Sequence, residues 1–327
     1  MPDLSVEIES WPITGSFTIS RGTKTAADVV TVILKDGARQ GRGECVPYRH
    51  YGETLESVTR QIGAVADAVQ EGLSRNELLD LLPAGAARNA IDCAIWDLEA
   101  KWGDTPVWQL AGFAKAPAPV TTAYTLSLGT PEAMFEAAKK AAHRPLLKVK
   151  LGLDGDLERL AAIREAAPEP KLIADANEGW NPKTLETFLS DLLPFHLSLI
   201  EQPVPAKEDG GLKGLQSPIP LCADESFRMT KDMERLAELY DVVNIKLDKT
   251  GGLTEALRAV KRARAFDLGI MVGCMLGTSL AMAPAVLLAQ GADFVDLDGP
   301  LLLAKDRAPG LHYEGSLLHP PEPQLWG

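Results

Sequence analysis

The chain has 327 residues, of which 46% are hydrophobic and 24% are charged, with a formal net charge of −12. This composition is typical of a globular protein, and the acidic balance argues against a nucleic-acid partner, since nucleic-acid binding draws on a concentrated basic surface. Four widely spaced cysteines without a CxxC pair, and no apolar stretch long enough for a bilayer, favour a reduced, cytoplasmic protein with a small-molecule partner and no membrane.

The first part of the chain predicts an α+β domain. Apolar and polar residues alternate in four runs before Thr54, with Gly and Asp in the turns, which predicts an antiparallel meander. From Glu56 to Lys101 the spacing changes to the three and four residues of helices. A Pro- and Ala-rich boundary follows at Lys115–Val120. We therefore expect a first domain over residues 1–115.

Eight short apolar runs then recur, separated by helix-like stretches, at intervals of roughly 22 to 28 residues. They are TTAYTLS, LLKVK, KLIADAN, LSLIEQP, IPLCADES, VVNIKLDK, IMVGCM and FVDLDGP. Thr130 and Thr230 are expected to begin two of the intervening helices. The alternation predicts an α/β fold, a modified (β/α)8 barrel over residues 116–307, capped by the first domain. Residues 308–327 are expected to return to the capping domain.

Charged residues end most of these runs, and in such a barrel the carboxyl ends of the strands meet at one mouth, where active sites of this fold lie. Counted from TTAYTLS, lysines end the second and sixth strands, on opposite sides of a ring of eight. Carboxylates end the third, fourth and fifth strands, between the lysines. The order predicts three anionic groups flanked by two ammonium groups.

Lys148 and Lys150 are two residues apart on one strand and therefore point to the same face. A KxK pair is most often a solvated strand end. Inside a barrel, however, burial and a second ammonium group lower the pKa of a lysine, which would prepare one of the pair as a general base. Lys246, on the opposite side of the mouth, would return a proton to the other face of the same carbon.

Asp175, Glu201 and Asp224 end consecutive strands. A single such residue is more often a helix cap than a metal ligand. Three on adjacent strands, including a Glu that caps poorly, favour a metal site, and all-oxygen ligands favour Mg²⁺ over zinc. Asp296 and Asp298 are further candidate ligands, although a substrate ammonium group is the partner we expect for them.

Together these motifs resemble the enolase superfamily, its muconate-lactonizing subgroup, and within that subgroup the dipeptide epimerases. The motifs, in chain order, are SRG, RGEC, PYRHYGE, PAGAARNAIDCAIWDLEA, KVK, DAN, EQP, ADES, NIKLDKTGG and DLDGP. The resemblance covers nearly the whole chain. It implies inversion of the α-carbon of a dipeptide's C-terminal residue by two-base proton transfer through an enolate, with glutamate as the first candidate residue, in the context of murein peptide metabolism.

The resemblance also implies roles for individual residues. Lys150 and Lys246 would be the acid/base catalysts, and one Mg²⁺ per active site would be held by Asp175, Glu201 and Asp224. Substrate-binding residues would be Lys148, Thr125, Asp296, Asp298, Cys274, Met275, Leu276 and Arg21. For Arg21 two interpretations stay open: it pairs with a glutamate carboxylate, or it is an exposed hairpin residue.

Other functions fit parts of the same pattern. An o-succinylbenzoate synthase or a muconate cycloisomerase of the subgroup would leave Asp296 and Asp298 without a cation to bind. A lysine Schiff-base lyase on the same barrel would need no metal. A non-catalytic binding barrel would be expected to have gaps in the catalytic set. The oligomeric state stays open, and a homo-oligomer is compatible with the sequence.

Overall fold

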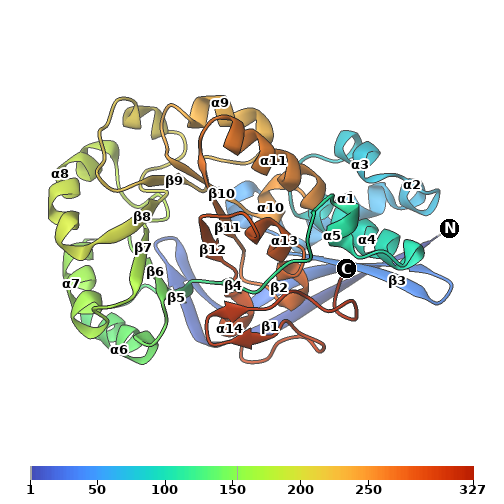
Figure 1. The fold of residues 1–327 in the computed structure, drawn as a ribbon, viewed down its shortest axis with the longest axis horizontal. Helices are drawn as coiled ribbons and strands as arrows, with labels where there is room; N and C mark the ends of the chain where they lie inside the picture. Colours follow the sequence, from blue (N-terminus) through green and yellow to red (C-terminus); the bar gives the residue numbers. More distant parts are fainter. Residues whose placement is uncertain (1, 153) are drawn as a thin grey trace.

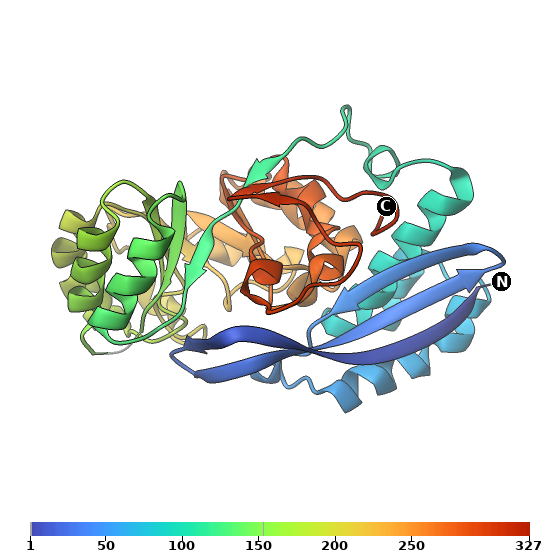
Figure 2. The same cartoon turned by 90° about the horizontal axis from the view of Figure 1, so that it is seen from below.

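The computed structural model describes residues 2–152 and 154–327. They contain a three-stranded antiparallel sheet with a layer of helices, an eight-stranded parallel sheet and a second, small three-stranded sheet. Figure 1 shows the amino-terminal sheet and helices α1 to α5 on one side of the barrel strands. Seen from below in Figure 2, the long first two strands extend from this cap to the barrel. Within the described residues no helix has both the length and the apolar character that a membrane span needs.

The cap sheet has three strands in the order β1-β2-β3. They are β1 (Asp3–Ile19), β2 (Gly22–Asp36) and β3 (Arg39–Cys45). The prediction of four strands is wrong, because the first two of the four runs, VEIESW and the start of FTISRG, lie in one strand, β1. The register shifts between Pro12 and Phe17, where Gly15 has a φ of 74°. The expected turn is therefore an irregularity within a continuous strand, which glycine accommodates without strain.

Helix α4 packs closely against the cap sheet. The cap helices are η1 (Arg49–Tyr51), α1 (Leu55–Ala64), α2 (Ala66–Gln70), α3 (Arg75–Leu81), α4 (Ala86–Gly103) and α5 (Val107–Leu110). A Cβ added at Gly43 in β3 would lie 2.1 Å from the carbonyl oxygen of Ala90. Only glycine permits this approach, which buries the apolar face formed by Val30, Val32 and Leu34 of β2.

The second sheet has the order β12-β11-β10-β9-β8-β7-β6-β5, with every adjacent pair parallel. Its strands are β5 (Tyr124–Leu126), β6 (Leu146–Lys150), β7 (Lys171–Asp175), β8 (Leu197–Glu201), β9 (Leu221–Ala223), β10 (Val242–Ile245), β11 (Gly269–Gly273) and β12 (Phe294–Asp296). Hydrogen bonds link its edges. Among them, Ala123 N–H donates to Val295 O and Leu297 N–H donates to the Thr122 hydroxyl, both at 2.8 Å. The nearly closed ring confirms the predicted barrel with an amino-terminal cap.

Helices between the strands form the outer layer (Figure 1). They are α6 (Pro131–Ala141), α7 (Asp156–Ala166), α8 (Pro182–Leu192), η2 (Leu193–Phe195), η3 (Asp209–Leu212), η4 (Thr230–Asp232), α9 (Met233–Leu236), α10 (Leu247–Thr250), α11 (Leu253–Ala265), α12 (Ser279–Met282), α13 (Ala285–Ala289) and α14 (Gly299–Leu302). Thr130 caps α6 as predicted, accepting a bond from Ala133 N–H. Thr230 does not begin an α-helix, because its hydroxyl donates to Glu255 at 2.6 Å and a 3-10 turn precedes α9.

The carboxyl-terminal segment lies against α4. Three short strands, β4 (Val120–Thr121), β13 (Tyr313–Glu314) and β14 (Leu317–Leu318), pair near the barrel edge before the chain turns toward the cap. The Trp326 indole then donates to the carbonyl oxygen of Cys93 at 2.9 Å, and Gly327 N–H donates to Asp97 at 2.7 Å. These bonds join the end of the chain to the central helix of the cap.

Candidate active site

The candidate catalytic and metal-binding side chains lie at the carboxyl ends of adjacent barrel strands. In the register of the sheet Lys150 is the partner of Asp175, and Asp175 is the partner of Glu201. Asp224 follows β9 by one residue, and Lys246 follows β10 by one residue. All five are buried. The strand order places the two lysines on the second and sixth strands of the ring, with the three carboxylates between them.

Lys148 lies below this ring and binds three carboxylates at once. Its Nζ is 2.7 Å from Glu201, 2.7 Å from Asp296 and 3.1 Å from Asp175. Burial would lower the pKa of this ammonium, but the three neighbouring negative charges outweigh burial and raise it well above its usual value. The expected lowering of the lysine pKa is therefore wrong for Lys148, which is a fixed positive charge in this state.

The two lysines on opposite sides each contact one of the carboxylates. Lys150 donates to Asp175 at 2.6 Å, and Lys246 donates to Asp224 at 2.6 Å while lying 3.9 Å from Glu201. Burial favours a lower pKa for Lys246, but Asp224 and Glu201 raise it above its usual value. Without compensation of the carboxylates by another cation, Lys246 is thus held in its protonated form.

The pKa values of the carboxylates Asp175 and Glu201 are shifted in opposite directions. Burial alone would raise the pKa of Asp175, but Lys150 and Lys148 lower it to about 2. Burial and, second to it, the neighbouring charge of Asp175 together raise the pKa of Glu201 to about 7. Glu201 is therefore the least compensated of the three, and a further cation would be most stabilising beside it.

The donor set fits a hard divalent cation such as Mg²⁺, since it consists of carboxylate oxygens. Asn244 donates to Oε1 of Glu201 at 2.8 Å, whereas among the described residues the buried Oε2 has no hydrogen-bond donor and only an ion-pair contact, 2.7 Å from Lys148 Nζ. As the side chains now lie, ammonium groups stand between the carboxylates, and no three acidic or other ligand groups of the described residues converge in a coordinating arrangement. A metal would have to replace these ammonium contacts.

Lys249 is a buried residue of this site for which no role was predicted from the sequence. Its Nζ contacts Oδ1 of Asp224 at 2.5 Å, the Asp224 carbonyl oxygen at 2.6 Å and the Asn244 carbonyl oxygen at 2.9 Å. It therefore fixes one oxygen of Asp224 and leaves Oδ2 directed at Lys246. The DKTGG motif contained this lysine, but its partners come from the preceding strands.

A second group of polar residues ends β5 and β12. Thr125 N–H donates to Asp298 at 2.6 Å, and the Thr125 hydroxyl is 3.5 Å from Asp296. Burial and, second to it, the charge of Asp296 together raise the pKa of Asp298 to about 7. A bound ammonium group would compensate both carboxylates, so the arrangement suits recognition of a primary amine.

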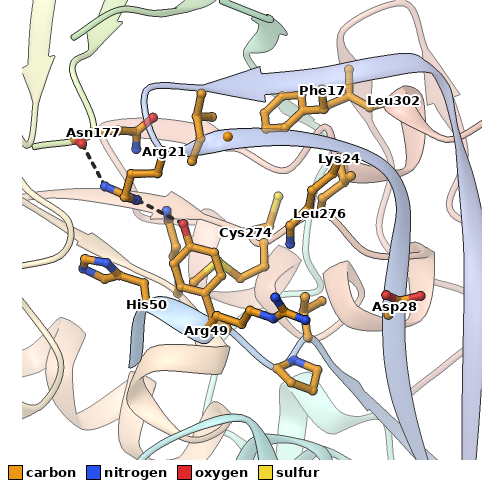
Figure 3. Close-up of a pocket in the computed structure, with 18 of the residues that line it drawn as sticks. Phe17, Arg21, Lys24, Asp28, Arg49, His50, Asn177, Cys274, Leu276 and Leu302 are labelled. Carbon is orange, nitrogen blue, oxygen red and sulfur yellow. Dashed lines mark hydrogen bonds between the residues drawn. The ribbon is translucent and has the colours of Figure 1, made fainter. Parts of the chain in front are cut away.

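A cavity of about 1020 Å³ opens above these strand ends. The predicted site residues that line it are Thr125, Lys148, Lys150, Asp224, Lys246, Cys274, Met275, Leu276, Asp296, Asp298 and Arg21. Asp175 and Glu201 do not line it and lie fully buried beneath. The tip of the β1–β2 hairpin and the segment around η1 complete its walls (Figure 3).

Arg21, at the hairpin tip, bridges the cap to the barrel. Its guanidinium donates to the carbonyl oxygen of Asn177 at 2.8 Å, to Glu178 at 3.2 Å, to the Tyr48 hydroxyl at 3.0 Å and to Glu225 at 2.6 Å. Figure 3 shows two of these bonds. Its side chain is 26% exposed, so Arg21 is not a free hairpin residue. Whether it also contacts substrate stays a prediction.

The comparisons with known proteins agree with this geometry. Residues 2–112 match the model of the mandelate racemase / muconate lactonizing enzyme N-terminal domain, and residues 132–314 match the enolase C-terminal domain-like model. The chain therefore belongs to the enolase superfamily. Within it, the chain is 44% identical to L-Ala-D/L-Glu epimerase of Escherichia coli over 98% of this chain and 100% of that protein.

The chain is also similar to a racemase and to a solved structure of another member of the enolase family. The chain is 46% identical to N-acetyl-D-glutamate racemase of a Pseudoalteromonas species, over 91% of this chain and 95% of the relative. A crystal structure of an Agrobacterium tumefaciens enolase family member with homology to dipeptide epimerases, with sodium and L-Ala-L-Glu bound, is 53% identical. It covers 100% of both chains with a TM-score of 0.98.

Proposed function

We propose that this protein is a Mg²⁺-dependent isomerase that epimerises the C-terminal residue of dipeptides, with L-Ala-D/L-Glu as the first candidate substrate. The observation that carries the proposal is the placement of Lys150 and Lys246 on opposite strands of the ring, with three buried carboxylates between them. Two bases on opposite faces of one carbon are what inversion requires, because one removes the α-proton and the other returns a proton from the opposite side.

The proton next to a carboxylate is weakly acidic, because its removal leaves a dianion. A Mg²⁺ held by Asp175, Glu201 and Asp224 would supply electrostatic stabilisation of that charge. Lys148 is a fixed, buried ammonium beside two of these carboxylates and would hold the substrate carboxylate.

Lys150 would take the proton from one stereoisomer and Lys246 from the other. Each now contacts a carboxylate of the proposed metal site, and the carboxylates beside Lys246 raise the pKa of that lysine above its usual value. Compensation of these carboxylates by a bound cation would free both lysines from these contacts and would lower the pKa of Lys246 toward the range of a general base. Metal binding and the activation of both bases would thus be coupled.

Asp296, Asp298 and Thr125 would hold the free amino terminus of the dipeptide. Cys274, Met275 and Leu276, which follow β11, would line the pocket beside it. The two relatives described above are named for a glutamate derivative, so glutamate is the first candidate for the residue that is inverted. A cytoplasmic location and a role in murein peptide metabolism belong to the same proposal, and a homo-oligomer is compatible with it.

N-acylglutamate racemisation is a second candidate function, favoured by the 46% identity to N-acetyl-D-glutamate racemase. Its substrate has no ammonium group. The paired carboxylates Asp296 and Asp298, both buried, would then face an uncharged acyl group, which is unfavourable. This electrostatic argument places the dipeptide first.

The test is proton NMR of the purified protein with Mg²⁺ in D₂O. The substrates are L-Ala-L-Glu, L-Ala-D-Glu and N-acetyl-D-glutamate. We expect loss of the C-terminal α-proton signal and appearance of the other diastereomer with the dipeptides. Faster exchange of N-acetyl-D-glutamate than of either dipeptide would establish the second function. No exchange with any of the three would contradict both and favour the cycloisomerase and dehydratase relatives.

A further inference from the structure

The two proposed bases are held by different kinds of structure. Lys150 is the last residue of β6 and pairs in the ladder with Asp175 of the neighbouring strand. Lys246 lies one residue beyond β10 and is the N-cap of α10, a helix of four residues. A helix of a single turn is not stable by itself, so the backbone that carries Lys246 depends on contacts outside the sheet.

Helix α4 of the cap supplies one of these contacts through Asp248, in α10. The Asp248 carboxylate accepts hydrogen bonds from the Asn89 side chain at 2.9 Å and from Val46 N–H at 3.0 Å. Asn89 is fully buried, and its amide oxygen accepts a bond from the Cys93 thiol at 3.2 Å, which directs the amide nitrogen at Asp248. Both donors to Asp248 come from the cap, so this carboxylate attaches α10 to the cap.

The turn after α10 is held by the same face of α4. Arg88 donates to the carbonyl oxygens of Thr250 at 2.6 Å and Gly251 at 3.1 Å. A Cβ added at Gly251 would lie 2.5 Å from Nε of Arg88, so the turn approaches the helix more closely than a side chain allows. One turn further along α4, Asp92 accepts a bond at 2.9 Å from a backbone N–H in the first turn of α11. Because residues three and four positions apart share one helix face, Arg88, Asn89 and Asp92 form a single contact surface.

This contact surface lies outside the substrate cavity. Arg88, Asn89 and Asp92 do not line the cavity, and neither does Asp248, whereas Lys246 does. Within the part of the chain that the structure describes, no hydrogen bond joins α4 to β6, the strand of the other lysine. An effect of α4 on the reaction would therefore act through Lys246.

We propose that Asn89 and Asp248 are positioning residues for Lys246, through which the cap holds one of the two bases against the reacting carbon. The inference rests on the proposed function and adds that proton removal by the two lysines depends unequally on the cap. Without the bond between Asn89 and Asp248, α10 loses an attachment and shifts relative to the barrel mouth. A misplacement of about 1 Å can cost about a hundredfold in rate. Lys150, paired within the sheet, keeps its position.

The test measures loss of the α-proton signal from L-Ala-L-Glu and L-Ala-D-Glu, supplied separately in D₂O with saturating Mg²⁺. The isomer that Lys246→Ala no longer exchanges is the one that reports on Lys246. We expect Asn89→Ala, and Asp248→Ala from the other side of the bond, to slow exchange of that isomer at least about tenfold and of the other isomer less than about threefold. Asp248→Asn, whose amide oxygen can still accept both hydrogen bonds, should retain most of the rate.

Asp97→Ala is the matched control. Asp97 is a buried residue of α4, but its bonds go to Arg42 N–H, Lys101 and Gly327 N–H and not to α10. This variant should unfold at a lower temperature and leave the ratio of the two exchange rates unchanged.

Two outcomes would overturn the inference while leaving the proposed function intact. They are slowing of both isomers to the same extent by Asn89→Ala or Asp248→Ala, and an unchanged exchange rate for the isomer that reports on Lys246. Because the two variants remove one bond from opposite sides, the test holds with either of them, measured on protein shown to be folded by thermal unfolding. A wild-type protein that exchanges neither dipeptide would overturn the proposed function and this inference with it.

Discussion

Replacement of Lys148 by Met removes the ammonium group that now compensates three buried carboxylates. Lys148 is 1% exposed, and its Nζ lies within 3.1 Å of Asp175, Glu201 and Asp296. Breaking a buried ion pair by removal of one partner costs about 3–5 kcal/mol, because the other charge is left uncompensated. We therefore expect Lys148→Met to lower the free energy of unfolding by about that amount in the presence of EDTA.

The same substitution should strengthen the response to Mg²⁺. In the wild-type chain a metal held by Asp175 and Glu201, as proposed, would compete with Lys148 for these carboxylates, and this competitor is absent from the variant. A ligand at 100 times its dissociation constant stabilises the folded state by about 2.7 kcal/mol, so tighter binding gives a larger rise in melting temperature at the same Mg²⁺ concentration.

The assay is urea or thermal unfolding of both proteins in EDTA and across a Mg²⁺ titration. Lys213→Met, which removes an exposed ion pair with Glu238, is the matched control and should change neither stability nor the response to Mg²⁺. A Lys148→Met protein as stable as wild type in EDTA, or one that responds less to Mg²⁺, would refute the electrostatic argument.

Three further predictions concern other parts of the molecule. Gly43→Ala places a Cβ 2.1 Å from the carbonyl oxygen of Ala90 and should lower the free energy of unfolding by about 1–3 kcal/mol or more, measured by urea denaturation. Burial raises the pKa of Asp248 to about 7, so its contribution to stability is present below the unfolded pKa and is lost as pH rises through 7. The free energy of unfolding of Asp248→Asn, measured relative to wild type, should therefore increase by up to about 4 kcal/mol from pH 4 to pH 8. The same difference in unfolding free energy between variant and wild type at both pH values would contradict this. Asp298→Asn should raise KM for L-Ala-L-Glu at least about tenfold while affecting N-acetyl-D-glutamate less, as steady-state kinetics would measure.

The eight recurring apolar runs were sufficient to predict the barrel, and the charged residues that end them were sufficient to predict the relative placement of its strand ends. Lys150, Asp175 and Glu201 each end an apolar run, and parallel pairing of those runs brings them to one level. The cap was predicted less accurately. Gly15 looked like a turn between two strands, and only the pairing of β1 with β2 along its whole length makes it an irregularity within one strand.

The partners of individual side chains could not be predicted from the sequence, because they depend on contacts between segments that are far apart in the chain. Arg21 and Asn177 are 156 residues apart in the chain, yet they share a hydrogen bond. The contact between Lys249 and Asp224 could not be predicted for the same reason. The expected lowering of the pKa of Lys148 was wrong because the sequence shows how many lysines are present but not how many carboxylates surround each one.

The most direct test of the two-base account is α-proton exchange by Lys150→Ala and Lys246→Ala, followed by NMR in D₂O with Mg²⁺ and with L-Ala-L-Glu and L-Ala-D-Glu supplied separately. The account predicts that neither variant interconverts the diastereomers, and that each retained exchange is confined to the one stereoisomer whose α-proton faces the remaining lysine. Epimerisation by both variants at the wild-type rate would contradict it.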